Sequence, residues 1–109
     1  EMDELFKHFG YSNMHMGTVE GDFSIESFLD KLKNLHPAHV HLAPFMIVAG
    51  DHATNDMSGE DDDSWKSILE KEGYSVKCTL KGLGEIQAVR DIFIRHTRAG
   101  LDRLSEIQA

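Results

Sequence analysis

Two side chains that can exchange protons or bind a metal ion stand in polar segments of this sequence, Glu20 in TVEG and His52 in AGDH. A histidine titrates near neutral pH, and a carboxylate can accept a proton, so the pair can take protons from a substrate. The same two groups form a ligand set that suits cobalt, nickel, iron or zinc better than magnesium or calcium. Glu85, directly after Gly82-Leu83-Gly84, is a further candidate.

Each candidate also has a purely structural interpretation. Glu20 precedes a glycine, as a solvated turn residue would, and His52 stands among polar residues that often only satisfy a loop backbone. Gly82–Glu85 fits the first turn of a helix better than a phosphate-binding loop, since it lacks a Lys-Ser/Thr partner and a third glycine. Both interpretations of Glu20 and His52 remain open at this point.

Other residues with ligand-type side chains have weaker patterns. His39 and His41 flank Val40, so in a strand they point to one side and form either a metal pair or two partly buried polar groups. Residues 61–63 are three aspartates that suit the first turn of a helix. The methionines favour core packing over binding of a soft metal.

Hydrophobic spacing and turn residues predict the elements that must position these groups. The predicted helices and strands are a helix over Met2–Phe9 closed by Gly10, a strand over Asn13–Val19, a helix capped by Ser24 with Ile25, Phe28, Leu29 and Leu32 on one face, a strand over Val40–Val48 interrupted by Pro44, a helix from Asp61–Asp63 to Gly73, a strand over Tyr74–Leu80 and a helix over Glu85–Leu104.

Strands that alternate with helices predict a parallel sheet. The expected fold class is α/β, a small open parallel sheet with helices on both faces, formed by residues 1–109 as a single domain. Ligands of such sheets bind outside the carboxyl ends of the strands. Glu20, His52 and Glu85 all follow a predicted strand, so this position predicts one site that contains Glu20 and His52, with Glu85 as a possible third member.

Length and charge narrow the classes of function. The chain has 109 residues, 40% of them hydrophobic, with 11 basic and 19 acidic side chains and a net charge of −8. Such a charge repels phosphate backbones and anionic lipid, which argues against nucleic-acid and membrane partners. One cysteine cannot form an internal disulfide, and no apolar run approaches the roughly 20 residues of a membrane span. No signal-peptide pattern opens the sequence, so a soluble domain is expected.

Four segments together resemble a known enzyme family. They are GTVEG (17–21), HLAPFMIVAGDH (41–52), the longer string VAGDHATNDMSGEDDDSW, and LKGLGE (80–85). Over Leu5 to Ala99 the sequence resembles the anaerobic-pathway sirohydrochlorin cobaltochelatases, which are class II tetrapyrrole chelatases. The resemblance implies a protein of two α/β lobes with the tetrapyrrole between them, of which this chain looks like the C-terminal lobe.

The resemblance also implies a metal site and a reaction. The family holds its metal with two histidines and one glutamate; Glu20 and His52 match two of them, and the other histidine belongs to the N-terminal lobe. The implied reaction is ATP-independent insertion of Co²⁺ (with Fe²⁺ or Ni²⁺ as other metals) into sirohydrochlorin, in the cytoplasm unless a removed signal peptide directed the chain to the periplasm. His52 would bind the metal and take a proton, and Glu20 would neutralise charge opposite it.

Two further hypotheses share this lobe. One is a non-catalytic metal or haem carrier, and the other is a half-protein that works only with an N-terminal lobe or a second subunit. Because the substrate carries many carboxylates and the chain has a net charge of −8, local cations are required. Lys81, Arg90 and Arg95 are available for this.

Overall fold

The computed structural model describes residues 2–21, 23–35 and 37–108 as an α/β arrangement around two short strands. In chain order, the elements are α1 (Met2–His8), α2 (Ile25–Leu35), β1 (His39–Leu42), the π-helix η1 (His52–Met57), α3 (Trp65–Lys71), β2 (Ser75–Cys78), the 3₁₀ turn η2 (Leu83–Glu85) and α4 (Gln87–Gln108). The α/β fold class expected from the sequence is confirmed.

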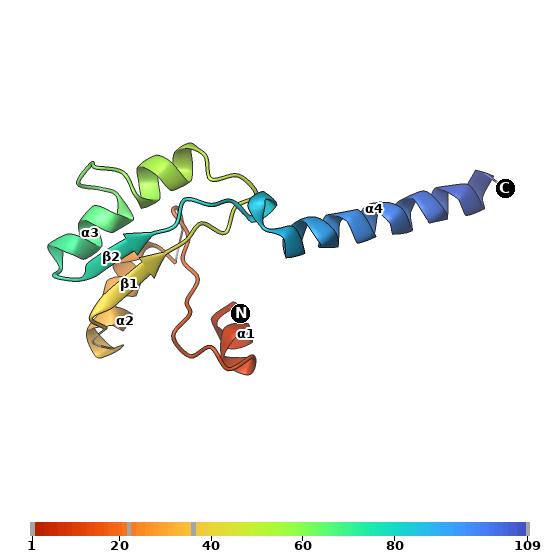
Figure 1. Cartoon of the computed structure of the whole chain (residues 1–109). Helices are drawn as coiled ribbons and strands as arrows, with labels where there is room; N and C mark the ends of the chain where they lie inside the picture. Colours follow the sequence, from red (N-terminus) through yellow and green to blue (C-terminus); the bar gives the residue numbers. More distant parts are fainter. Residues whose placement is uncertain (1, 22, 36, 109) are drawn as a thin grey trace.

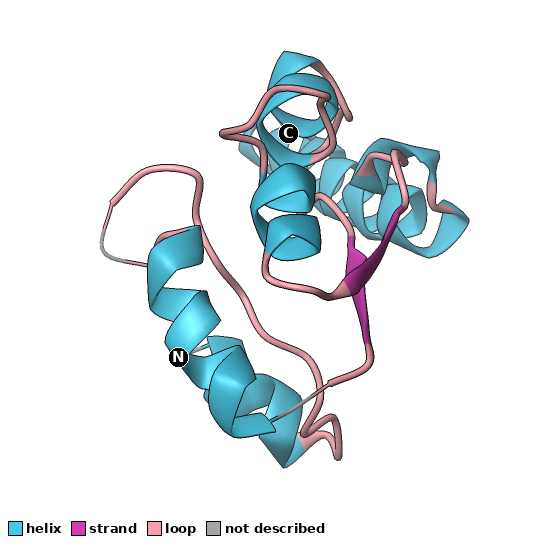
Figure 2. Ribbon diagram, turned by 90° about the vertical axis from the view of Figure 1, so that its left-hand side faces the viewer, coloured by secondary structure: helices cyan, strands magenta, loops and turns pink. Residues whose placement is uncertain are grey.

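Strands β1 and β2 pair in parallel, with His39 opposite Ser75 and Leu42 opposite Cys78. The connection between them contains η1 and α3, and α3 packs against β2. Helices α2 and α3 lie on the same side of the two strands (Figure 2). Phe28 of α2 and Trp65 of α3 both border Gly17. The carboxyl ends of both strands therefore open toward the segments that continue to His52 and to Lys81.

The strand predicted over Asn13–Val19 is wrong, because residues 13–21 contain no strand. The backbone amides of this segment are bonded elsewhere. The Met16 amide donates to the Asp3 carboxylate at 2.8 Å, and the Thr18 amide donates to the Phe23 carbonyl at 2.9 Å, which closes a local turn. Gly17 is fitted closely between two aromatic rings, since a Cβ there would lie 2.7 Å from both Phe28 and Trp65.

The strand predicted over Val40–Val48 ends at Leu42, because the buried Pro44 has no amide to donate. The chain nevertheless stays paired beyond this point. The Leu83 amide donates to the Met46 carbonyl at 2.7 Å, and the Gly84 amide donates to the Ile47 carbonyl at 3.0 Å. The segment before His52 is thus joined to the segment after Lys81 without regular strand geometry.

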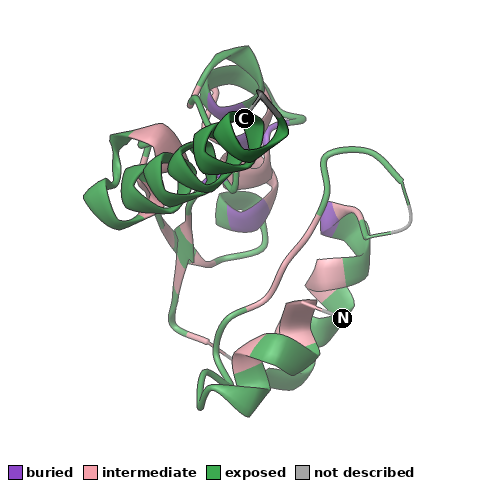
Figure 3. Cartoon of the chain, turned by 90° about the vertical axis from the view of Figure 1, so that its right-hand side faces the viewer, coloured by how far each residue is buried: buried purple, intermediate pink, exposed green. Residues whose placement is uncertain are grey.

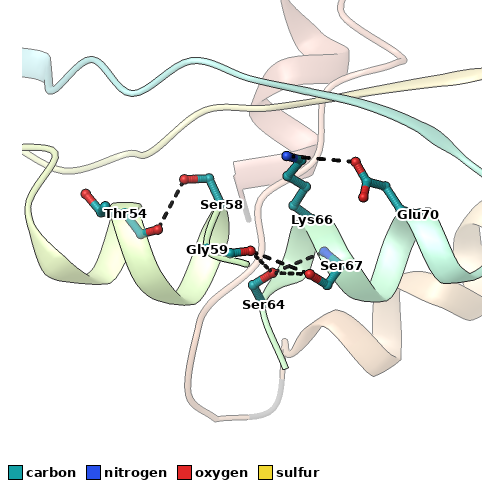
Figure 4. Close-up of polar contacts among 7 residues, drawn as sticks. All are labelled: Thr54, Ser58, Gly59, Ser64, Lys66, Ser67 and Glu70. Carbon is teal, nitrogen blue, oxygen red and sulfur yellow. Dashed lines mark hydrogen bonds and ion pairs between the residues drawn. The ribbon is translucent and has the colours of Figure 1, made fainter. Parts of the chain in front are cut away.

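Helix α3 begins later than its aspartates suggested, because Ser64 is its N-cap. The Ser64 hydroxyl accepts from the Ser67 amide at 3.1 Å and donates to the Gly59 carbonyl at 2.8 Å (Figure 4). Ser64 has no exposed surface. The three aspartates therefore precede the helix and lie outside its first turn. This serine cluster fastens α3 to the end of η1.

The buried core is small, and helix α4 lies outside it. Among the described residues, the buried apolar side chains are those of Ile25, Pro44, Ala53, Met57 and Leu69. Helix α4 extends away from the body of the molecule, and from Arg90 to Ile107 all of its side chains are exposed (Figure 1, Figure 3). No helix in the described part of the chain is both long and apolar enough to cross a membrane.

Candidate functional site

A wide groove of about 1500 Å³ runs between α2 and the β1 strand. It exceeds the roughly 300–1,000 Å³ of an ordinary small-molecule pocket. Methionine and aromatic side chains supply much of its wall, among them Met14, Met16, Met46, Phe45 and Trp65. Such a surface suits a large, flat and mainly apolar ligand.

The structure brings Glu20 and His52 to this same groove, although they are far apart in sequence. Glu20 is exposed in the turn that ends at Gly21, whose φ of +100° favours glycine. His52 is the first residue of η1. One carboxylate and one imidazole therefore line one groove, although residues 13–21 do not form the strand from which the position of Glu20 was predicted. Their role as metal ligands stays a prediction.

The imidazole of His52 is oriented by a carboxylate within the same helix. Its Nδ1 lies 2.8 Å from Oδ2 of Asp56, so Nδ1–H donates to the carboxylate and Nε2 keeps its lone pair. The side chain of His52 is 73% exposed. An imidazole with one nitrogen bonded to a carboxylate and the other exposed is the usual form of a metal-binding histidine. Sequence reasoning noted Asp56 only as part of a polar loop.

The π-helix that carries His52 was predicted as a loop. Its inner side is anchored by Ala53 and Met57, which are 0% and 6% exposed. The Ser58 hydroxyl donates to the Ala53 carbonyl at 3.1 Å. It also lies within donating distance of the Thr54 carbonyl, at 3.3 Å (Figure 4). The Ala53 carbonyl also accepts from the Ser58 backbone amide at 3.2 Å, so Ser58 closes the end of the helix that presents His52.

Glu85 does not belong to the groove wall. Its carboxylate accepts from the Gly82 amide at 2.9 Å, and its own amide donates to the Gly82 carbonyl at 3.1 Å. These reciprocal bonds close the turn before α4, which is the structural interpretation of the GLGE segment. Glu85 is thus removed from the candidate site.

Histidines 39 and 41 also line the groove, and His41 has a partner of its own. Its Nε2 lies 2.6 Å from the Thr79 hydroxyl, across the ends of the two strands. Within residues 2–21, 23–35 and 37–108, no three His, Cys, Asp or Glu side chains are grouped closely enough to hold a metal ion. Glu20 and His52 thus do not form a complete metal site with any third side chain of the described part.

Comparison with known proteins identifies the family of the chain. The family described as "Cobalt chelatase (CbiK)" matches residues 1–102. The chain belongs to this cobalt chelatase family. It is 40% identical over 91 residues to a sirohydrochlorin cobaltochelatase of Salmonella typhimurium and 35% identical over 94 residues to the sirohydrochlorin cobaltochelatase CbiKC of Nitratidesulfovibrio vulgaris. These matches cover 84% and 86% of this chain but 34% and 33% of the relatives, so the chain spans about a third of their length.

In this CbiK-family chain, one further polar cluster beside the groove was missed by sequence reasoning. Asp3 accepts hydrogen bonds from His15 Nδ1 at 2.9 Å, from the Met16 amide at 2.8 Å and from Lys31 Nζ at 3.3 Å. Burial alone would raise the pKa of Asp3, but these three bonds together outweigh it and lower the pKa to about 2. No spacing rule could have paired residues 3 and 31, which are brought together only by the tertiary fold.

Proposed function

We propose that this chain forms the metal-binding lobe of a sirohydrochlorin cobaltochelatase, which inserts Co²⁺ into the tetrapyrrole without ATP. The observation that carries the proposal is the joint placement of Glu20 and His52 on one large apolar groove, in a chain of the CbiK family. The names of the two relatives support the same reaction and substrate. The reaction belongs to tetrapyrrole biosynthesis, for which we propose a cytoplasmic location.

The chemistry requires a metal carrier and a proton acceptor on one face of the macrocycle. Co²⁺ replaces two pyrrole protons, so two protons must leave as the metal enters. His52 can bind Co²⁺ through Nε2, because Asp56 holds the proton on Nδ1. Glu20 supplies a negative charge that offsets the metal and can accept one pyrrole proton. The other proton can be taken by Nε2 of His52, which becomes free as the metal enters the ring. Protons then pass to water, since both side chains are exposed.

The apolar groove wall would hold the macrocycle over these two groups. Removing water from the face of the macrocycle strengthens the interaction of the metal with Glu20 and His52. Binding energy from the wall can also favour a distorted ring whose nitrogens point toward the metal. We propose that an N-terminal lobe or a second subunit completes the cleft and supplies the remaining metal ligand.

The test is Co²⁺ insertion into sirohydrochlorin, followed by the absorbance of the macrocycle. One arm contains this chain alone, and the other adds the N-terminal lobe of a cobaltochelatase as a second polypeptide. We expect turnover in the second arm, and turnover in the first arm as well if two copies of the chain complete the cleft. Stoichiometric metal binding without turnover in both arms would contradict the proposal and favour a carrier.

Substitution of His52 tests the assignment of the site. We expect His52→Ala to lower insertion to the uncatalysed rate, and Glu20→Gln to lower it by a factor of about 100 or more. The matched control is His8→Ala, because His8 is an exposed histidine of α1 outside the groove wall. Circular dichroism checks that each variant folds. Turnover of His52→Ala equal to that of His8→Ala would exclude His52 as a metal ligand. Competition with Fe²⁺ and Ni²⁺ in the same assay tests the preference for Co²⁺.

A further inference from the structure

We propose that Lys81 recognises a peripheral carboxylate of the tetrapyrrole and so selects acidic macrocycles over esterified or less carboxylated ones. This inference rests on the proposed chelatase function and adds a specificity residue to it. Positive charge is distributed unevenly around the groove. All 11 lysines and arginines lie in the described part of the chain, and Lys81 is the one that lines the groove.

The other basic side chains are placed elsewhere. Arg90, which the sequence offered as a cation for the substrate, is bonded to the Gly84 carbonyl at 3.1 Å and to Gln87 at 2.7 Å. Arg95 is exposed on α4, and Lys31 is paired with Asp3. Lys81 is exposed, and no hydrogen bond or ion pair joins it to another residue of the described ranges. Its ammonium group is therefore available to a ligand.

Backbone contacts fix Lys81 relative to His52. The next residue, Gly82, is buried against the segment that leads to His52; a Cβ on Gly82 would lie 2.8 Å from Val48 Cα and 2.9 Å from Ala49 N. The hydrogen bonds from Leu83 and Gly84 to residues 46 and 47 hold the same two segments together. The residue that would bind metal and the residue that would bind carboxylate are thus carried by one paired unit.

The positive charge of Lys81 should strongly affect the binding of an acidic ligand. The chain has a net charge of −8, so a polyanion approaching it meets a repulsive field. Apart from histidines, the acidic and basic residues of the groove wall are Glu20 and Lys81. A carboxylate bound next to Lys81 would be partly enclosed by apolar side chains, which strengthens the pair relative to one on an open surface. The rest of the macrocycle then extends toward Glu20 and His52.

The test compares two ligands in the preparation that shows turnover, either the chain alone or the chain with an N-terminal lobe. The ligands are sirohydrochlorin and its methyl ester, and the variants are Lys81→Ala, Lys81→Glu and Lys81→Arg. We expect Lys81→Ala to raise the KM for sirohydrochlorin about five- to tenfold with little change in kcat, and Lys81→Glu to raise it further. Lys81→Arg should keep most of the affinity. For the methyl ester, all variants should match the wild type.

The matched control is Lys77→Ala, which removes an exposed lysine of β2 that does not line the groove. Equal KM values for Lys81→Ala and Lys77→Ala, with the wild type active, would overturn the role of Lys81 and leave the chelatase proposal standing. An equal loss for the acid and for the ester would also overturn it, since that loss would come from packing. A wild type inactive in every preparation would overturn both proposals.

Discussion

The single contact that most defines the site is the bond between His52 and Asp56, 2.8 Å long and spanning one turn of η1. It keeps the proton on Nδ1 and thereby leaves Nε2 for a metal. We expect Asp56→Asn to weaken Co²⁺ binding about tenfold, because the amide keeps the hydrogen bond but removes the negative charge. The measurement is a titration with Co²⁺ followed by its visible absorption.

The control for this variant is Asp51→Asn. Asp51 precedes η1 and is exposed, and its side chain makes no capping bond. If Co²⁺ affinity depended only on the total negative charge near His52, the two variants would lose the same amount of affinity. An equal change in the two affinities would therefore contradict a specific role for Asp56.

Asp3 is the residue whose charge should matter most for stability. Its pKa is about 2 in the folded chain, against an ordinary value of 3.8, so the folded state favours the ionised carboxylate. This stabilisation is fully present above about pH 4 and is lost as the pH falls toward 2. We expect Asp3→Asn to lower the free energy of unfolding by about 1 kcal/mol at pH 7, after allowance for solvent screening.

Urea unfolding at pH 7 and at pH 3, followed by circular dichroism, measures this effect. The wild type should lose stability between these values, and the variant should lose less. Lys33→Ala controls for removal of a nearby exposed charge on α2. An unchanged pH dependence in Asp3→Asn would show that another group causes the acid sensitivity.

At the scale of the elements, the junction of residues 82–84 with residues 46–49 joins the two halves of the site. We expect Gly82→Ala to destabilise the fold by about 1–3 kcal/mol, because its methyl group would collide with backbone atoms that cannot move aside easily. Gly100→Ala is the matched control. That glycine lies within α4, and apart from the adjoining stretch of the helix itself no atom lies within 4 Å of the position that an added methyl group would take. Gly100→Ala should therefore gain about 0.5–1 kcal/mol of helix stability.

Thermal unfolding of both variants checks these signs. A destabilised Gly100→Ala would mean that α4 is packed in solution against something that its methyl group disturbs. An unchanged stability of Gly82→Ala would mean that residues 46–49 and 82–84 separate easily. The two segments would then not hold Lys81 and His52 in fixed relative positions.

The sequence predicts the helices better than the strands, and the reason is physical. The apolar spacing of Ile25, Phe28, Leu29 and Leu32 is a local property, and α2 forms there as expected. Residues 13–19 alternate just as clearly, but a strand needs a neighbour that accepts its hydrogen bonds. Here the Met16 amide is taken by Asp3, a partner 13 positions away that no alternation pattern indicates.

The sequence likewise predicted only part of the candidate site. Glu20 and His52 line one groove, as expected. The strand ends from which this was predicted are not present, however, since residues 13–21 form no strand and β1 ends at Leu42. The contacts of Asp56, Asp3 and Lys81 depend on the exact turn of η1 and on how distant segments meet. Spacing alone could not distinguish Lys81 from Arg90 and Arg95 as the cation of the groove.

At the scale of the whole molecule, the chain is expanded. Its radius of gyration is 17.9 Å, and its extents are 62 × 31 × 25 Å, whereas a compact domain of this length has a radius of gyration of about 13 Å. The projecting helix α4 accounts for the long axis (Figure 1). Its side chains from Arg90 to Ile107 have no core to stabilise them.

Helix α4 should therefore be the least protected part of the described structure. A helix without tertiary contacts draws its stability from local propensity alone, and Gly100 lowers that propensity beyond the middle of α4. We expect backbone amides of residues 97–108 to exchange with solvent at least about tenfold faster than those of β1 and β2. Hydrogen exchange with mass spectrometry measures this difference, and equal protection would mean that the helix is covered in solution.

Trp65 gives the chain an intrinsic fluorescence signal beside the groove. It is the single tryptophan of the chain, it lies at the start of α3, and its indole borders both the main groove and a smaller cavity of about 350 Å³ beside Glu20. Tetrapyrroles absorb light in the region where tryptophan emits. A macrocycle seated in the groove would therefore quench nearly all of the tryptophan fluorescence by energy transfer, and the emission of the unlabelled chain would report occupancy of the groove in real time.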